Sequence, residues 1–446
     1  MCDNWIQVQC GMGLRNPAQR TRLVWSALLF FVVALLACDE ADHASQGVTE
    51  KNDESNIESW GREYLESRLF RRIVLEQSLN FQENGYARLR LNEYGVSENG
   101  VDSAWELLPE FAPSVRPFIQ GDSSDMPFEP VPRLAEDWTR ADLYSLGQWA
   151  FERYPVQLDG ASEVLVRQNE DLTWWGMGVD DEGQVGGLVE VQLASGGIAL
   201  GMTCATCHGD VVDGVPVDGR AVADFDRGRL LADAAVGGGA GDGPAQAVWG
   251  AGRVDVTADG VSNPQAIADL RPIRYQRQLN ATGGVTNTLP ALAVRIETLI
   301  ITSHGGQVRP PRDVSLALAW YLWNLEPASA PDSQATPEQL LLGRAVFDRE
   351  CARCHGDGVT TVGLVPMSDV GTDTRAGDSP ERGTGMWRVP TLVGVSGRSQ
   401  WFHAGVQGTL LDVFSQSRLE WEPGHTFGLN LNDAEKVALL AWLGQQ

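Results

Sequence analysis

Two five-residue stretches carry most of the information about this 446-residue chain: Cys204-Ala205-Thr206-Cys207-His208 and Cys351-Ala352-Arg353-Cys354-His355. Each is a C-x-x-C-H motif, the attachment signature of a c-type haem. The two thiols of such a motif lie one helical turn apart and form thioether bonds to the porphyrin, while the histidine ligates the iron. We therefore predict two covalently bound haem c groups. The attachment residues are Cys204, Cys207, Cys351 and Cys354, and the proximal iron ligands are His208 and His355.

Other kinds of Cys-x-x-Cys site fit this pattern less well. Structural zinc sites pair two such knuckles about 15–20 residues apart, whereas these two motifs are far apart and each is followed by histidine. Thioredoxin-like redox motifs lack the trailing histidine. The pattern favours haem over both alternatives.

The order of features around the first motif recurs around the second, which indicates a duplicated unit. Each motif is followed by a short x-x-P-x-L segment, a His-containing turn and an apolar helix. These are residues 288–292, 304–305 and 314–323 in the first unit, and 388–392, 403–405 and 436–443 in the second. A turn-rich linker at 327–336 separates the units. The first haem domain therefore spans 59–326, and the second spans 337–446.

These features predict a mainly α fold with two cytochrome c-like haem domains and long loops, the first enlarged by an N-terminal extension. Thr336 is a candidate N-cap, with Gln339 completing a capping box, and Asn432 with Glu435 repeats the pattern before the last helix. Residues 60–79 have helical spacing of apolar residues, and the Gly- and Val-rich stretch 174–201 allows a short hairpin.

The second unit resembles the C-terminal haem domain of the di-haem cytochrome c peroxidase and MauG superfamily, related lipoprotein cytochromes, and rubber oxygenases of the RoxA type. The resemblance depends on residues 351–355, 387–392, 401–405, 408–410 and 424–428. Ala404 departs from the family, which usually has Asp or Asn after this histidine. Similarity is good over 336–446, fair over 200–326 and absent before about residue 170. The second unit is also about the size of a small class I cytochrome c, in which the first and last helices cross over the haem edge, and it has both helices.

The sixth ligand of each iron decides between electron transfer and substrate chemistry. In some members of the resembling family the histidine of the G-H-x-F-G tail is the distal ligand, which favours His425 for the second haem. Met386 is the second choice, Met367 is a weaker candidate, and His403 is interpreted as a structural histidine. For the first haem, the iron is either ligated by His304 or open.

The N-terminus has the pattern of an exported lipoprotein. Residues 1–37 read as a signal peptide, with Arg15, Arg20 and Arg22 before an apolar run. The end of that run, Leu35-Leu36-Ala37-Cys38, resembles a lipobox, so we expect lipidation of Cys38 and a disordered polar tether over 38–58. An uncleaved anchor helix is the alternative. This predicts a lipid-anchored protein of the bacterial cell envelope, on the periplasmic or outer-membrane face.

The formal charge of -25 argues against nucleic acid as a partner. The expected partners are a redox donor or acceptor protein, or a small oxidant, with the membrane contacted through the lipid anchor. Of the seven cysteines, two belong to the predicted signal peptide, one to the lipid and four to haem, so none remains for a disulfide.

Two function classes follow from these observations. The first is a di-haem c-type cytochrome that transfers electrons. The alternative is a di-haem peroxidase that reduces hydrogen peroxide, or a RoxA-like oxygenase, with an open first haem. A haem sensor or scaffold is a third, weaker possibility.

Overall fold

The computed structural model describes residues 56–94, 104–121, 126–238, 243–256, 262–329, 335–379 and 382–446. The predicted signal peptide, Cys38 and nearly all of the predicted tether lie outside these residues. Ile57–Gln446 forms one compact unit. Within the described ranges, every helix is too short or too polar to cross a membrane.

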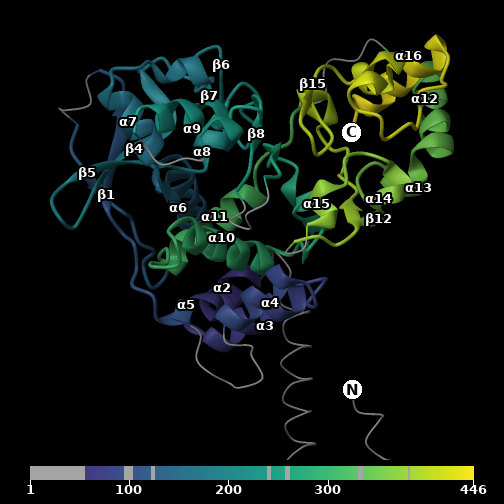
Figure 1. Ribbon diagram of the computed structural model, residues 1–446. Coiled ribbons are helices and arrows are strands. Elements are labelled where there is room, and N and C mark those ends of the chain that lie inside the picture. The colour runs from purple at the N-terminus through teal and green to yellow at the C-terminus, as the bar shows by residue number, and fades with distance from the viewer. Residues whose placement is uncertain are drawn as a thin grey trace, which may run out of the picture. The chain divides into compact units, whose positions relative to one another are not determined.

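Four helices at the start of this unit pack against two central helices (Figure 1). The four are α2 (Ile57–Glu66), α3 (Arg68–Ser78), α4 (Gly85–Glu93) and α5 (Ala104–Leu107), and the central pair is α10 (Leu289–Ser303) and α11 (Arg312–Trp323). Ser67 and Asn84 cap α3 and α4 by accepting hydrogen bonds from backbone N–H groups. Tyr64 of α2 is buried and donates to Glu297 of α10 over 2.8 Å. This bond joins the N-terminal helices to the central pair.

A five-stranded antiparallel sheet follows, in the order β2-β1-β4-β5-β3. Its strands are β1 (Ser114–Ile119), β2 (Glu129–Pro130), β3 (Gln157–Leu158), β4 (Gln184–Gln192) and β5 (Ile198–Met202). Val115, Val189 and Val191 form one buried cluster, which Trp149 joins from α6 (Arg140–Arg153). Leu188 and Leu200 belong to a second cluster, to which α7 (Gly160–Arg167) and α9 (Arg227–Val236) contribute. Strand β5 leads directly into the first C-x-x-C-H motif.

The expected mainly α fold is therefore confirmed only in part. Helices predominate, but the sheet is larger than the short hairpin expected at 174–201. Two of its strands contain only two residues each, and such short strands carry too little alternation to be recognised in sequence.

Two pairs of helices cross in the same way, one pair for each motif. In the second half, α12 (Pro337–Glu350) crosses α16 (Asp433–Leu443), and a Cβ atom on Gly343 would lie only 2.1 Å from the Ala438 carbonyl oxygen. In the first half, α6 crosses α11, and a Cβ atom on Gly147 would lie 2.2 Å from the Ala317 carbonyl oxygen. The two glycines stand in similar sequences, Leu146-Gly-Gln-Trp-Ala-Phe-Glu-Arg153 and Leu342-Gly-Arg-Ala-Val-Phe-Asp-Arg349.

This repeat changes the description of the first half. Helix α12 runs directly into the second motif, whereas β3, α7, β4 and β5 stand between α6 and the first motif. The enlargement of the first half is therefore partly an insertion after its first helix, in addition to the N-terminal helices α2–α5.

Short two-stranded ribbons and loops complete the fold and connect the halves. The Ala266 N–H donates to the His403 carbonyl over 2.9 Å, and the Arg388 N–H donates to the Ala281 carbonyl over 2.8 Å. The remaining elements are β6 (Gly209–Val212), β7 (Val215–Asp218), β8 (Arg253–Val254), β9 (Gln265–Ala266), β10 (Gln278–Leu279), β11 (Val285–Thr286), β12 (Leu364–Pro366), β13 (Met386–Arg388), β14 (Gln400–Trp401), β15 (Val406–Gln407), α8 (Ala205–His208), α13 (Ala352–His355), α14 (Met367–Val370) and α15 (Arg375–Asp378).

Candidate functional site

The first motif forms the single-turn helix α8 against strand β4. The Thr206 hydroxyl donates to the Gly187 carbonyl over 2.7 Å. Gly187 has a φ of +69°, and a Cβ atom there would lie 2.0 Å from the Thr206 nitrogen, so only glycine allows this approach. His208 Nδ1 lies 2.8 Å from the Ala268 carbonyl oxygen. A proton on Nδ1 makes this bond and leaves Nε2 as the atom that can ligate a metal.

The second motif is held in the same manner. His355 Nδ1 lies 3.2 Å from the Pro390 carbonyl oxygen, within the x-x-P-x-L segment identified in sequence. Burial lowers the pKa of His355 to about 4 and also lowers the pKa of His208. Both imidazoles are therefore neutral at pH 7, which is the form that binds a metal.

The four motif thiols are free and partly buried. Burial raises the pKa of Cys204 to about 12 and the pKa of Cys351 to about 11, so both are protonated at neutral pH. Zinc binds thiolates in sites of four ligands. In the described residues no group of three or more His, Cys, Asp or Glu side chains is placed to hold a metal ion. The described residues around each motif therefore supply too few ligands for a zinc site of this kind.

His425 faces the second proximal histidine. The ring centres of His355 and His425 are 6.4 Å apart. A metal–imidazole bond is about 2 Å long, and the ring centre lies about 1 Å behind the ligating nitrogen, so two histidines on opposite faces of one iron have ring centres roughly 6 Å apart. In addition, His425 Nδ1 is buried and has no hydrogen-bond partner among the described residues. This spacing and the orphaned nitrogen fit an iron held between the two rings.

The backbone around His425 is fixed by a buried arginine. His425 has a φ of 51°, in the left-handed region that β-carbon-bearing residues rarely adopt. Arg418 is 1% exposed, and its guanidinium donates to the carbonyls of Val413 (2.7 Å), Glu422 (2.8 Å), Gly424 (2.7 Å) and His425. Arg418 is thus a positioning residue for His425. Sequence analysis missed it because nothing local distinguishes this arginine from a surface one.

The other sequence candidates for the second site have different surroundings. His403 stacks on Trp387, with ring centres 4.2 Å apart and planes 25° apart. Met367 is 4% exposed and packs with Ala376 and Trp387 in a small apolar cluster. Met386 lies on β13, opposite Pro366 of β12. Of the two histidines among these candidates, it is His425 whose ring contacts that of His355 in the described part of the chain.

His304 has partners away from the first motif. It lies at the C-terminal end of α10, where its Nε2 is 3.2 Å from the Pro155 carbonyl oxygen and its ring contacts Phe111 at 4.7 Å between centres. Burial lowers the pKa of His304. To ligate an iron it would have to use Nδ1 or give up the bond to Pro155.

A cavity of about 170 Å³ lies beside the first motif, lined in part by Ala205, Gly209, Glu152 and Asp218. Burial raises the pKa of both carboxyl groups, and Tyr321 of α11 donates to Asp218. Glu152 comes from α6 and Asp218 from β7, so their proximity was not visible in sequence. Asp180 also lines the cavity, and the carboxyl groups of Glu152 and Asp218, with their raised pKa values, could hold a proton there.

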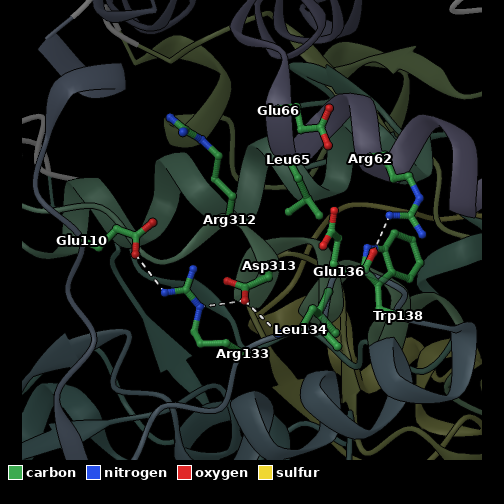
Figure 2. Close-up of a pocket in the computed structure, with 11 residues that line it drawn as sticks. Arg62, Leu65, Glu66, Glu110, Arg133, Leu134, Glu136, Trp138, Arg312 and Asp313 are labelled. Atoms are coloured by element: carbon green, nitrogen blue, oxygen red, sulfur yellow. Dashed lines mark hydrogen bonds and ion pairs between the residues drawn. The ribbon is translucent and has the colours of Figure 1, made fainter.

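A second cavity, of about 290 Å³, lies between α2, the 133–138 segment and the start of α11 (Figure 2). Some of its charged groups are paired with one another. Arg133 bonds to Asp313 over 2.8 Å and to Glu110 over 3.1 Å, and Arg62 donates to the Glu136 carbonyl over 2.6 Å. Neither motif lines this cavity, and its paired charges serve to connect the elements around it.

No family model matches the chain, and no curated protein sequence is similar to it. Among solved structures, the hydrazine synthase of Kuenenia stuttgartiensis is 19% identical, with 44% of this chain and 76% of that chain covered and a TM-score of 0.31. A MauG-like protein associated with microbial copper homeostasis is 16% identical, with 44% and 77% covered and a TM-score of 0.32. Scores this low describe a partial geometric similarity, so the haem assignment depends on the motifs and the residues around them.

Proposed function

We propose that this protein is a di-haem c-type cytochrome that transfers electrons at the bacterial cell envelope. The observation that carries the proposal is the His355–His425 pair, with ring centres 6.4 Å apart. Haem c, when bound, supplies a one-electron redox couple. If His355 and His425 both held the second iron, they would leave no position for a substrate, which is the arrangement of an electron carrier.

The residues around the second site support this role. Burial keeps His355 and His425 neutral, each with its pKa lowered to about 4, so both can bind iron throughout the neutral range. The Pro390 carbonyl orients one ring, and Arg418 holds the backbone of the other. Phe402 and Phe427 contact the His425 ring and help to exclude water from it. A site that changes little between oxidation states favours rapid electron exchange.

The repeated helix crossing supports two cytochrome c-like units. Each motif has its own glycine-mediated crossing, at Gly147 and at Gly343. Each motif histidine also has its Nδ1 bonded to a backbone carbonyl further along the chain, Ala268 or Pro390. We therefore propose that both motifs hold haem c.

Electron paramagnetic resonance of the matured protein tests the proposal. Spectra are recorded for the oxidised and the one-electron-reduced protein, and for His425→Ala with Met386→Leu as the matched control. We expect the second iron to be low-spin in the wild type and in Met386→Leu, and high-spin in His425→Ala. A high-spin signal from Met386→Leu, with His425→Ala unchanged, would assign the ligand to Met386 instead.

A peroxidase or oxygenase with an open first iron is the second candidate. The specific observation in its favour is the bond between His304 Nε2 and the Pro155 carbonyl. His304 is the predicted distal ligand of the first iron, and this bond uses its Nε2 for another partner. Glu152 and Asp218 then offer protonatable groups near the first motif. A high-spin first iron in the wild type, together with peroxide consumption by the half-reduced protein, would place this candidate first. Low-spin signals from both irons, in the oxidised and in the half-reduced sample, would instead support electron transfer as the function.

The envelope location and the lipid on Cys38 belong to the same proposal. Its motivation is the lipobox-like sequence Leu35-Leu36-Ala37-Cys38. Expression of the full chain and of Cys38→Ser in a bacterium with a lipoprotein pathway, followed by fractionation, tests it. Wild-type protein should be recovered with membranes. Recovery of Cys38→Ser with membranes as well would favour the uncleaved anchor helix.

A further inference from the structure

Strands β6 and β7 form an antiparallel ribbon directly after the first motif, and Figure 1 shows it at the outer edge of the first half. Strand β6 begins at the residue that follows His208. We call residues 209–218 the valine ribbon. Its apolar residues other than glycine all stay partly or largely exposed, and they are Val211, Val212, Val215, Pro216 and Val217. Val215 is 58% exposed. The valine ribbon therefore presents apolar side chains to solvent beside the first motif.

The turn that precedes β4 lies against the valine ribbon and extends its apolar surface. The Asp181 N–H donates to the Gly214 carbonyl over 3.2 Å. A Cβ atom on Gly178 would lie 2.8 Å from Cγ2 of Val211, so the turn runs close beside β6. Val179, the next residue of the turn, is 37% exposed. Apolar side chains from two neighbouring segments thus stay exposed together, which is typical of an interaction site.

The rim of this surface is acidic. Three exposed carboxylate side chains lie on the turn and at the tip of the valine ribbon, namely Asp181, Glu182 and Asp213. The Asp181 carboxylate reaches the tip of the ribbon, because a Cβ atom on Gly214 would collide with its Oδ1. Arg220, just beyond the ribbon, is paired with Asp210 over 2.9 Å. The exposed rim therefore carries negative charge.

The valine ribbon also borders the cavity beside the first motif. Pro216 lines this cavity together with Ala205 of the motif and Gly209, which follows it. The described lining contains three acidic side chains and one basic side chain, that of Arg153. The excess of negative charge therefore continues from the ribbon into the cavity. A protein bound on the ribbon would lie next to the first motif.

We propose that the valine ribbon and the turn before β4 form the docking surface for a positively charged electron-transfer protein. This inference rests on the proposed function and names the class of its partner. Apolar side chains at the centre of an interface exclude water, and complementary charges at its rim attract the partner and orient it. An acidic rim selects a basic partner, because like charges across an interface are costly. The exchange moves one electron between the two proteins and forms or breaks no bond.

Electron exchange with a lysine-rich class I cytochrome c tests this surface on the matured full-length protein. Stopped-flow absorbance gives the second-order rate constant at ionic strengths of about 10 mM and about 1 M. We expect Asp181→Asn with Glu182→Gln to lower the rate constant about 5- to 10-fold at the lower ionic strength, because two attractive charges are lost. The difference should vanish at the higher ionic strength, where the Debye length is about 3 Å.

Glu76→Gln with Glu83→Gln is the matched control. Both carboxyl groups are exposed among the N-terminal helices, and their loss changes the net charge by the same amount. The control should change the rate constant less than about 2-fold. Val179→Ser with Val215→Ser removes apolar contact at constant charge. It should weaken binding about 5-fold and leave the dependence on ionic strength unchanged.

Calorimetry with the same cytochrome carrying zinc in place of iron measures docking without electron transfer. Selective weakening by the variants of the turn and the valine ribbon supports the surface even if the wild type exchanges no electrons, a result that would count against the proposed function alone. Equal rate constants and affinities in all variants would overturn the surface. An equal decrease in Asp181→Asn with Glu182→Gln and in the control would overturn it too, because only the net charge would then matter.

Discussion

At the scale of single residues, the site depends on atoms that hold histidines rather than on the histidines alone. His208 and His355 are oriented by the carbonyls of Ala268 and Pro390, and His425 by the four bonds of Arg418 to the surrounding backbone. The carbonyls determine which ring nitrogen of His208 and His355 is available, and Arg418 fixes the backbone from which the His425 ring extends.

Replacement of Arg418 by leucine should therefore destabilise the protein by at least about 2 kcal/mol, because four backbone carbonyls lose their donor in a buried setting. Urea unfolding measures the loss, and Arg167→Leu, an exposed position, is the control. The low-spin signal assigned to the second iron should weaken in the same variant. An unchanged signal in Arg418→Leu would show that His425 is positioned by other contacts.

The buried pair of Asp159 and Arg227 should make stability depend on pH. Burial raises the pKa of Asp159, but the charge of Arg227 and the hydrogen bonds from Arg227 and Ser162 outweigh it, so the pKa in the folded state is lowered. The stabilisation is therefore present above the unfolded pKa of about 3.9 and is lost as the pH falls through the lower folded value.

The free energy of unfolding of Asp159→Asn should accordingly be about 3 kcal/mol lower than that of the wild type at pH 7, because Arg227 is left buried and unpaired. The difference from the wild type should shrink in urea unfolding below about pH 4. A difference that stays constant from pH 7 to pH 3 would mean that the ion pair is not the cause.

At the scale of elements, the two helix crossings are the repeated feature of the fold. Gly147 lets α6 approach α11, and Gly343 lets α12 approach α16, where Phe347 and Trp442 then pack with ring centres 4.3 Å apart. The crossing brings the helix before the motif and the helix after it into contact. This contact sets the position of the segment that carries the motif, most directly for α12, which ends at Cys351.

Gly147→Ala and Gly343→Ala should each destabilise the protein by about 1–3 kcal/mol, because the added methyl group would overlap a backbone carbonyl of the facing helix. Gly160→Ala is the matched control, since a Cβ atom there meets no atom within 4 Å. It should be neutral or slightly stabilising. The denaturant midpoints of the three variants are compared with that of the wild type. A decrease in stability for Gly160→Ala as large as that of the other two variants would indicate a general effect of alanine instead.

At the scale of the whole molecule, side chains of the first half form hydrogen bonds with backbone groups of the second half. The Thr391 N–H donates to Gln276 Oε1 over 3.1 Å, and Arg277 donates to the Thr361 carbonyl over 3.1 Å. These bonds lie beside the segment that carries Pro390, the partner of His355. The second site is thus supported by residues of the first half.

We therefore expect Ile57–Gln446 to unfold in a single cooperative transition. Differential scanning calorimetry of the matured protein, with circular dichroism and haem absorbance followed in parallel, measures it. Coincident transitions are the expected result. Two separated transitions, one for each haem, would show that the halves are independent domains.

The features that were predicted correctly from the sequence are those that depend on neighbouring residues. The motifs were recognised from five consecutive residues, and the capping boxes of Thr336 with Gln339 and Asn432 with Glu435 are formed as predicted. These features need only one turn of chain. His425 was favoured through a family resemblance, and the structure places it beside His355.

The features that could not be predicted depend on segments that are far apart in the chain and meet through folding. Four features have no local signature in the sequence: the two-residue strands, the crossing at Gly147, the bond of His304 to Pro155 and the role of Arg418. Each exists because the fold brings a donor, an acceptor or a small residue against a partner. An arginine or a glycine looks the same in sequence whether its partner is water or a buried carbonyl, since the partner's distance in space is set by packing and not by the number of residues between them.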